Sequence, residues 1–116
     1  IPSLQPVIDA ALRIARVILD HEHLRYGFWF NEMAPGHCTS RHNHDDLDEL
    51  LSCVYYIQIP KNSGDLLLYQ DDRVVSLVPQ EGRFVFFDPM LDHEVGINNS
   101  DQFRLAVAFN FGLPVE

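Results

Sequence analysis

Apolar side chains near the start of the chain recur at the spacing of an amphipathic helix. Pro6 fits the first turn of such a helix, where the missing backbone N–H is not needed. The pattern predicts a helix over about residues 4–19 that packs one face against the rest of the protein. The apolar positions on that face are Val7, Ala11, Ile14, Ala15 and Ile18.

After residue 23 the pattern changes to short apolar runs separated by turn residues such as Pro35-Gly36. Runs at this spacing are typical of an antiparallel barrel or jelly roll. We expect one all-β domain over residues 1–116, with the leading helix covering one outer face of a sheet. The eight expected strands are Leu24–Met33, His37–His44, Leu50–Ile59, Leu66–Tyr69, Val74–Val78, Arg83–Asp88, His93–Asn98 and Phe103–Phe111.

The last of these runs has the pattern of a cavity wall. A strand places alternate side chains on opposite faces. One face of this strand carries Arg104, Ala106, Ala108 and Asn110. Two alanines beside a charge and an amide make a poor solid core, but they leave room for a ligand. We therefore expect Arg104 to face a cavity and to receive an anion there. The alternative for this face is a solvent-facing surface with Arg104 exposed.

Composition restricts the function further. The chain of 116 residues is long enough for one core, and its 47% of hydrophobic residues indicate a folded protein. The formal charge of -9 makes nucleic acids and anionic membrane surfaces poor partners. No apolar run is long enough to span a bilayer. The two cysteines, Cys38 and Cys53, are expected to stay reduced, which favours a cytoplasmic location.

Four residues in order carry the candidate chemistry: His44, Asp46, His93 and Arg104. The His-x-Asp pair and the later His supply two imidazoles and one carboxylate, the ligand set of non-haem Fe(II) sites with open coordination positions. From a neighbouring strand, Arg104 would present its guanidinium to a carboxylate near the metal. A single histidine is more often structural or solvated, so the combination carries the argument. The remaining histidines are His21, His23, His37 and His42.

Several further segments occur in a shared order between Trp29 and Phe111. They are Cys53-Val54-Tyr55-Tyr56-Ile57-Gln58, Ser63-Gly64-Asp65-Leu66, Arg83-Phe84-Val85-Phe86-Phe87 and His93-Glu94-Val95, followed by Arg104. Together they resemble the 2-oxoglutarate and Fe(II)-dependent dioxygenases, and within these the prolyl-hydroxylase branch. The resemblance implies a double-stranded β-helix of jelly-roll type, with Fe(II) as cofactor, 2-oxoglutarate as cosubstrate and ascorbate as an accessory reductant. The implied reaction hydroxylates a C–H bond and releases succinate and carbon dioxide.

The same resemblance assigns roles to individual residues. It implies that His44, Asp46 and His93 ligate iron. Arg104 and Tyr56 would bind the distal carboxylate of 2-oxoglutarate. Further candidates for the pocket lining are Asn31, Ala106 and Asn110.

Two features depart from the family pattern. Many relatives have Ser two residues after the Arg, where this chain has Ala106, so one hydroxyl contact is missing. The segment His42-Asn43-His44 is also a rival register for the His-x-Asp pair. The acidic stretch Asp45–Glu49 adds other carboxylates, which leaves the assignment of Asp46 open.

A cupin is the main alternative, because a Gly followed by His-x-His and Glu reproduces the start of the first cupin metal motif. The ligands of Mn, Fe or Zn would then be His42, His44, Glu49 and His93. Against this, Tyr56 replaces the Gly that closes the motif, and a cupin gives no role to Arg104.

A third alternative is a jelly-roll binding module without metal, in which Arg104 binds an acidic ligand. For the dioxygenase, the prolyl-hydroxylase resemblance favours a peptide or an amino-acid-like small molecule as substrate. The sequence does not indicate an oligomeric state.

Overall fold

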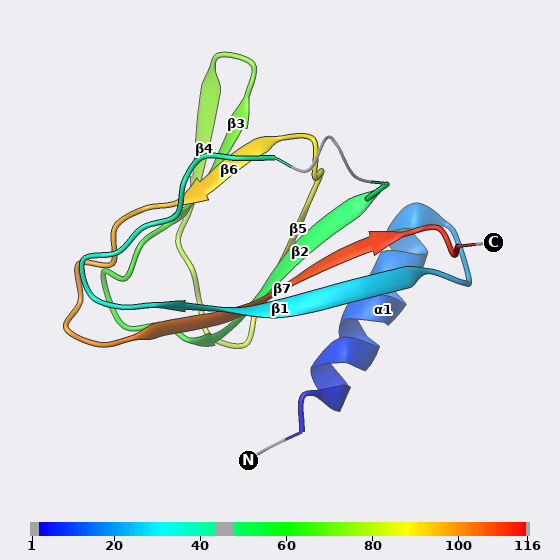
Figure 1. Ribbon diagram of the computed structural model, residues 1–116, viewed down its shortest axis with the longest axis horizontal. Helices are drawn as coiled ribbons and strands as arrows, with labels where there is room; N and C mark the ends of the chain where they lie inside the picture. Colours follow the sequence, from blue (N-terminus) through cyan, green and yellow to red (C-terminus); the bar gives the residue numbers. More distant parts are fainter. Residues whose placement is uncertain (1–2, 44–47, 116) are drawn as a thin grey trace.

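The computed structural model describes residues 3–43 and 48–115. Helix α1 (Gln5–Leu19) comes first, as predicted, and strands follow. In the described part of the chain the strands form a large sheet in the order β1-β7-β2-β5 and a small sheet in the order β4-β3-β6, with antiparallel pairing throughout (Figure 1). The strands are β1 (Arg25–Met33), β2 (Leu51–Gln58), β3 (Leu66–Gln70), β4 (Arg73–Leu77), β5 (Phe84–Phe87), β6 (Asp92–Val95) and β7 (Arg104–Gly112).

Helix α1 covers the outer face of the large sheet (Figure 1). Ala11 and Ala15 are fully buried there, because their small side chains let the helix approach the strands closely. The helix ends where Asp20 adopts a left-handed conformation and its N–H donates to the carbonyl of Arg16. The core on this side consists of Ile8, Ala11, Ala15, Leu51, Cys53, Val107, Phe109 and Phe111.

The buried face of α1 differs slightly from the predicted one. Ile8 is buried, whereas Ile18 is 51% exposed. Ile8, Ala11 and Ala15 also satisfy helical spacing. Ala11 and Ala15 belong to the predicted face as well. The covered face is therefore shifted slightly around the helix, so that Ile8 and Leu12 pack against the sheet and Ile18 does not.

The other face of the large sheet turns towards the small sheet. Leu66, Leu68 and Phe87 form a second core between the two sheets. The strand register aligns β1 and β2 on either side of β7: Trp29 and Val54 both lie opposite Ala108. Residues paired in this way point to the same face, so three strands contribute side chains to the interior of the jelly roll.

The strand predicted over residues 37–44 is irregular in its described part. His42 forms a single bridge with His93 of β6, and the N–H of Thr39 donates to the carbonyl of Val95. In the opposite direction the N–H of Val95 donates to the hydroxyl oxygen of Thr39 at 2.7 Å. A hydroxyl therefore takes the place of a backbone carbonyl, which interrupts a regular ladder.

Within residues 3–43 and 48–115, no helix combines the length and the apolar character that crossing a membrane requires.

Candidate functional site

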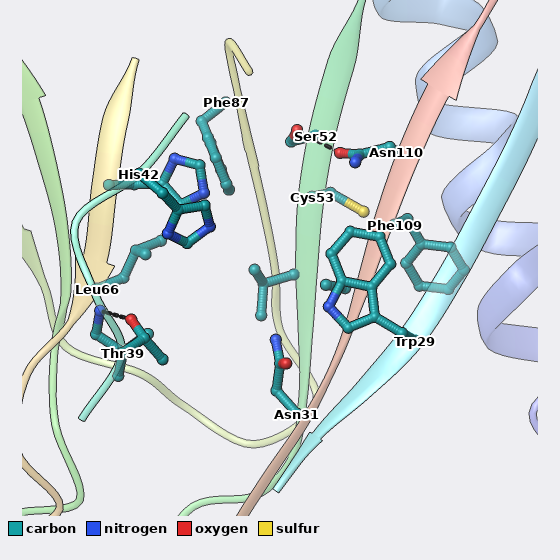
Figure 2. A pocket seen from close by; sticks show the side chains of 14 residues that line it. Trp29, Asn31, Thr39, His42, Ser52, Cys53, Leu66, Phe87, Phe109 and Asn110 are labelled. Carbon is teal, nitrogen blue, oxygen red and sulfur yellow. Dashed lines mark hydrogen bonds between the residues drawn. The ribbon is translucent and has the colours of Figure 1, made fainter. Parts of the chain in front are cut away.

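A cavity of about 110 Å³ lies between the two sheets (Figure 2). The large sheet supplies one wall. The facing wall consists of β6, the start of β3, and the segment 39–42, which pairs with β6. Side chains that line it include Trp29, Asn31, Thr39, His42, Ser52, Val54, Leu66, Phe87, His93, Val95, Ala108 and Asn110.

One side of the cavity carries a polar pair from neighbouring strands. The hydroxyl of Ser52 donates to the side-chain oxygen of Asn110 at 2.5 Å, and both residues are buried. Of the predicted lining residues, Asn31 and Asn110 lie at this cavity. Ala106 is buried beside it, between its strand partners Asn31 and Tyr56.

His93 reaches the cavity from β6 and is 7% exposed. Its Nδ1 lies 2.9 Å from the carbonyl oxygen of Leu91. A carbonyl can only accept a hydrogen bond, so Nδ1 carries a proton, and in the neutral imidazole Nε2 then carries the lone pair. The ring of Phe87 meets the imidazole edge-on at 4.8 Å between centroids. This arrangement, with one nitrogen oriented by a backbone carbonyl, is the one found in metal-ligating histidines.

His42 lies opposite His93 at the same cavity. The two residues exchange both backbone hydrogen bonds, at 3.0 and 2.8 Å, and their ring centroids are 4.3 Å apart. The Nδ1 of His42 lies 2.7 Å from the carbonyl oxygen of Ser40, so its Nε2 also carries the lone pair. The two imidazoles thus share one tautomer and one cavity.

The other two predicted ligands, His44 and Asp46, lie outside the described residues. Among the residues that the structure describes, no group of three His, Cys, Asp or Glu side chains could hold a metal ion. Glu49, a ligand in the cupin alternative, accepts hydrogen bonds from Arg25 at 3.3 Å and lines a different hollow beside Leu113.

Arg104 begins β7 and is 1% exposed. Its Nε and Nη2 atoms have no hydrogen-bond partner in the described part of the chain. Burial lowers the pKa of this guanidinium, and the nearby Tyr56 and Asp65 oppose that shift. An arginine stays charged at neutral pH even so. Burying a charge is costly unless it is paired, which makes the site receptive to an anion.

Tyr56 of β2 lies beside this guanidinium, with the centre of its ring 5.4 Å from the Arg104 carbon Cζ. The phenol is 1% exposed, and its oxygen has no hydrogen-bond partner among the described residues. Burial raises the pKa of Tyr56, while the Arg104 charge opposes the shift, so the phenol keeps its proton at neutral pH. A protonated phenol beside a guanidinium offers donors to one carboxylate.

The donor sets therefore fit the groups that the resemblance implies. The buried donors of Arg104 and Tyr56, which have no partner among the described residues, fit one end of a dicarboxylate such as 2-oxoglutarate. The imidazole of His93, with its lone pair on Nε2, fits a divalent metal such as Fe(II).

Sequence reasoning missed several lining residues. Trp29 could have been found, because strand alternation places it on the face of Asn31. Ser52 could not, because only the strand register brings it opposite Asn110. Thr39 and Phe87 likewise enter the lining through packing between the two sheets.

A comparison with curated proteins finds no significant sequence match. The chain is similar in structure to an oxidoreductase of the 2OG-Fe(II) oxygenase family from Burkholderia pseudomallei, with 13% identity, a TM-score of 0.81 and coverage of 97% of this chain and 57% of that one. It is also similar to a prolyl-4-hydroxylase from Pseudomonas putida, with 24% identity, a TM-score of 0.73 and coverage of 91% and 62%.

A prolyl hydroxylase from Trichoplax adhaerens, in complex with a peptide fragment of a hypoxia-inducible factor, is similar too. Its identity is 20%, its TM-score 0.74 and the coverage 94% of this chain and 54% of that one. These likenesses confirm the predicted double-stranded β-helix. This chain spans between 54% and 62% of the length of the three structures.

The family model of the 2OG-Fe(II) oxygenase superfamily matches residues 28–112, which include every strand but the first three residues of β1. The matched range contains both halves of the site, with His93 at the cavity and Arg104 beside Tyr56. The chain belongs to the 2OG-Fe(II) oxygenase superfamily.

Proposed function

We propose that this chain is an Fe(II)- and 2-oxoglutarate-dependent dioxygenase that hydroxylates a substrate and releases succinate and carbon dioxide. The observation that carries the proposal is the buried pair of Arg104 and Tyr56, whose donors lack hydrogen-bond partners among the described residues. Folding would not be expected to bury such donors without a ligand to receive them, since an unmet buried donor costs about 1–3 kcal/mol and a charged one more.

In this proposal Arg104 and Tyr56 hold the distal carboxylate of 2-oxoglutarate. A guanidinium can donate two parallel hydrogen bonds to a carboxylate, which fixes the orientation of the cosubstrate. The phenol adds a third donor, because it is protonated at neutral pH. The apolar side chains of Phe87 and Val95 line the neighbouring cavity.

At the cavity, His93 is proposed as one iron ligand, together with a second histidine from the segment His42-Asn43-His44 and the predicted carboxylate Asp46. The bound Fe(II) supplies the oxygen chemistry that couples decarboxylation of 2-oxoglutarate to hydroxylation of the substrate. His93 is prepared for this role because the carbonyl of Leu91 fixes its tautomer.

The substrate is proposed to be a peptide or a small molecule. The Trichoplax structure holds a peptide fragment, which supports the peptide class. The polar pair of Ser52 and Asn110, with Trp29 at the rim, gives the cavity groups that can orient an amide or a ring. A cytoplasmic location and the exclusion of nucleic acids remain predictions from the sequence.

The cupin alternative keeps one supporting observation, which is that His42 lies at the cavity with His93. Its fourth ligand, Glu49, is held by Arg25 at another hollow, which weighs against that ligand set. The dioxygenase and the cupin alternative differ in cosubstrate, because only the dioxygenase is expected to bind 2-oxoglutarate.

Release of succinate tests the reaction. The protein, loaded with Fe(II) and supplied with ascorbate and 2-oxoglutarate, is incubated with candidate peptides and amino-acid-like molecules. Succinate formation that depends on both iron and 2-oxoglutarate is the expected result. Metal binding without any affinity for 2-oxoglutarate would favour a cupin, and the absence of metal affinity would favour a binding module.

The cosubstrate site is tested by titrating 2-oxoglutarate into Mn(II)-substituted protein in a calorimeter. Arg104→Lys should weaken 2-oxoglutarate binding and leave metal affinity nearly unchanged, because an ammonium acts as a point charge and loses the two-pronged contact. Arg73→Lys is the matched control, since Arg73 is exposed on β4. Equal 2-oxoglutarate affinity in wild type and Arg104→Lys would overturn the proposed function.

A further inference from the structure

The chain has two histidines, His42 and His44, that compete for one place in the expected iron site. Of these, His42 lies within the described residues, and its relation to His93 can be judged directly. The two residues form a hydrogen-bonded antiparallel pair, with both backbone bonds present. Side chains of such a pair point to the same face, which here is the cavity.

The spacing of the two rings suits a shared ion. Two imidazoles bound to one ion at a right angle have ring centroids roughly 4.5 Å apart, given metal–nitrogen distances of about 2.1 Å. The observed separation is 4.3 Å. The ring planes are inclined at 57°, so the two rings are not stacked on each other.

Both rings are also oriented in the same way. In each, Nδ1 donates to the carbonyl of the residue two positions earlier, Ser40 for His42 and Leu91 for His93. Each imidazole therefore has its lone pair on Nε2. A solvated histidine at a cavity rim would not need this fixed tautomer, whereas a metal ligand does.

We propose that His42, rather than His44, is the first histidine ligand of the metal, so that His42 and His93 form the histidine pair. The proposal rests on the proposed function for the identity of the metal. It concerns the histidine pair alone and leaves the carboxylate ligand predicted at Asp46.

The hydrogen bonds of the Asp92 carboxylate support this pairing. Asp92, next to His93, accepts a hydrogen bond from Asn43 at 2.7 Å and one from Arg41 at 3.0 Å. These donors are the two neighbours of His42. Asp92 thus binds the side chains of both neighbours of His42 and restrains this segment opposite His93.

Asp92 and its two hydrogen-bond donors, Arg41 and Asn43, form a clamp around His42. The Arg41 side of this clamp also packs against a neighbouring strand. The guanidinium carbon of Arg41 lies 3.7 Å from the ring centre of Tyr69, and the Tyr69 hydroxyl donates to Glu94. Tyr69 belongs to β3, the partner of β6 in the small sheet. The segment that carries His42 is therefore fixed to two strands, as a metal ligand requires. Asp92 is a positioning residue in this scheme.

The histidine assignment is tested by calorimetric titration of Mn(II) into the metal-free protein. His42→Ala should lower Mn(II) affinity by more than about 100-fold, beyond the range for residues that only support a ligand. His44→Ala should leave the affinity little changed. His42 is exposed, so its replacement should not unfold the protein. His42→Asn is a second variant with the same expectation, and the thermal midpoint of each metal-free variant checks the fold.

A second readout is the visible absorption of bound Co(II), which reports its ligands. His42→Ala should change this spectrum, and His44→Ala should preserve it. The reverse pattern, with His44→Ala losing the metal and His42→Ala keeping it, would overturn the inference. Failure of the proposed function looks different: wild-type protein would bind Mn(II) through His42 and show no affinity for 2-oxoglutarate. A wild-type protein that binds neither Mn(II) nor Co(II) would overturn both.

The clamp is tested by a matched pair of variants. Asp92→Asn and Asp72→Asn each remove one carboxylate charge from the small sheet. Asp92 accepts hydrogen bonds from the two neighbours of His42, whereas Asp72 is exposed in the turn between β3 and β4. Asp92→Asn should weaken Mn(II) binding roughly 10-fold, as loss of a ligand-orienting contact does. Asp72→Asn should leave the affinity near that of wild type. Equal losses in both variants would show a general effect of charge and refute the positioning role.

Discussion

At the scale of single residues, Arg104 and Tyr56 show how burial prepares a side chain for a ligand. Arg104 begins β7 and Tyr56 lies in the neighbouring strand β2. Both keep donors without partners in the described part of the chain. Removing such a donor should cost affinity for the ligand and should not cost stability. This contrast separates a binding role from a structural one.

Tyr56→Phe should weaken 2-oxoglutarate binding to the Mn(II)-loaded protein by about 2- to 13-fold, the equivalent of one hydrogen bond worth about 0.5–1.5 kcal/mol. Its thermal midpoint should not fall, because the lost hydroxyl has no partner among the described residues. Calorimetric titration and thermal unfolding measure the two quantities. Tyr26→Phe, at an exposed position of β1, is the control. An unchanged affinity in Tyr56→Phe would remove this residue from the cosubstrate site.

At Gly64 the backbone conformation excludes any residue that has a Cβ atom. Its φ is +109°, and a Cβ at this position would collide with the carbonyl oxygen of Gly96. Gly64→Ala should therefore lower the free energy of unfolding by more than about 1 kcal/mol. Gly27→Ala is the control, because a Cβ there meets no atom within 4 Å. Urea denaturation compares the two variants, and similar midpoints would contradict this account of the loop.

Some residue roles can be predicted from sequence and others cannot. The alternation of β7 predicted that Arg104 would point inwards, and it is 1% exposed. The contact between Ser52 and Asn110 depends on strand register across 58 residues, which local patterns do not encode. The carboxylate of Glu49 was a cupin candidate by spacing alone, and a distant arginine, Arg25, determines where it lies.

At the scale of elements, the approach of α1 to the large sheet is set by two small side chains. Ala11→Leu should destabilise the protein by about 1–3 kcal/mol, because the added atoms have no space between helix and sheet. Val17→Leu, at a position 78% exposed on the same helix, should change stability by less than about 0.5 kcal/mol. Chemical denaturation followed by circular dichroism measures both. A fully stable Ala11→Leu variant would mean that α1 does not pack as described.

The elements themselves were largely predictable, because helical spacing and strand alternation are local properties. The predicted helix over residues 4–19 corresponds to α1, which begins at Gln5. The segment 37–43 was harder, because its form depends on β6, some fifty residues later. There the hydroxyl of Thr39 substitutes for a backbone acceptor, and the regular ladder is lost.

At the scale of the whole molecule, the charge of -9 predicts which large partners are excluded. Neutralising phosphates needs many lysines and arginines, and this chain has 8 against 17 acidic residues. Duplex DNA and RNA should not shift in a gel with the protein at physiological salt, so any dissociation constant should exceed about 10⁻⁴ M. Micromolar binding that weakens steeply with salt would contradict this prediction.

One consequence of the cavity lining concerns how the protein can be observed. Trp29 is the single tryptophan of the chain, and it stands at the cavity with 41% of its surface exposed. Light absorbed selectively by indole is therefore re-emitted from this one place. A ligand that enters the cavity changes the water around that ring, and a bound transition metal nearby quenches it. The intrinsic fluorescence of Trp29 thus reports whether the cavity is occupied, without an added label and without catalytic turnover.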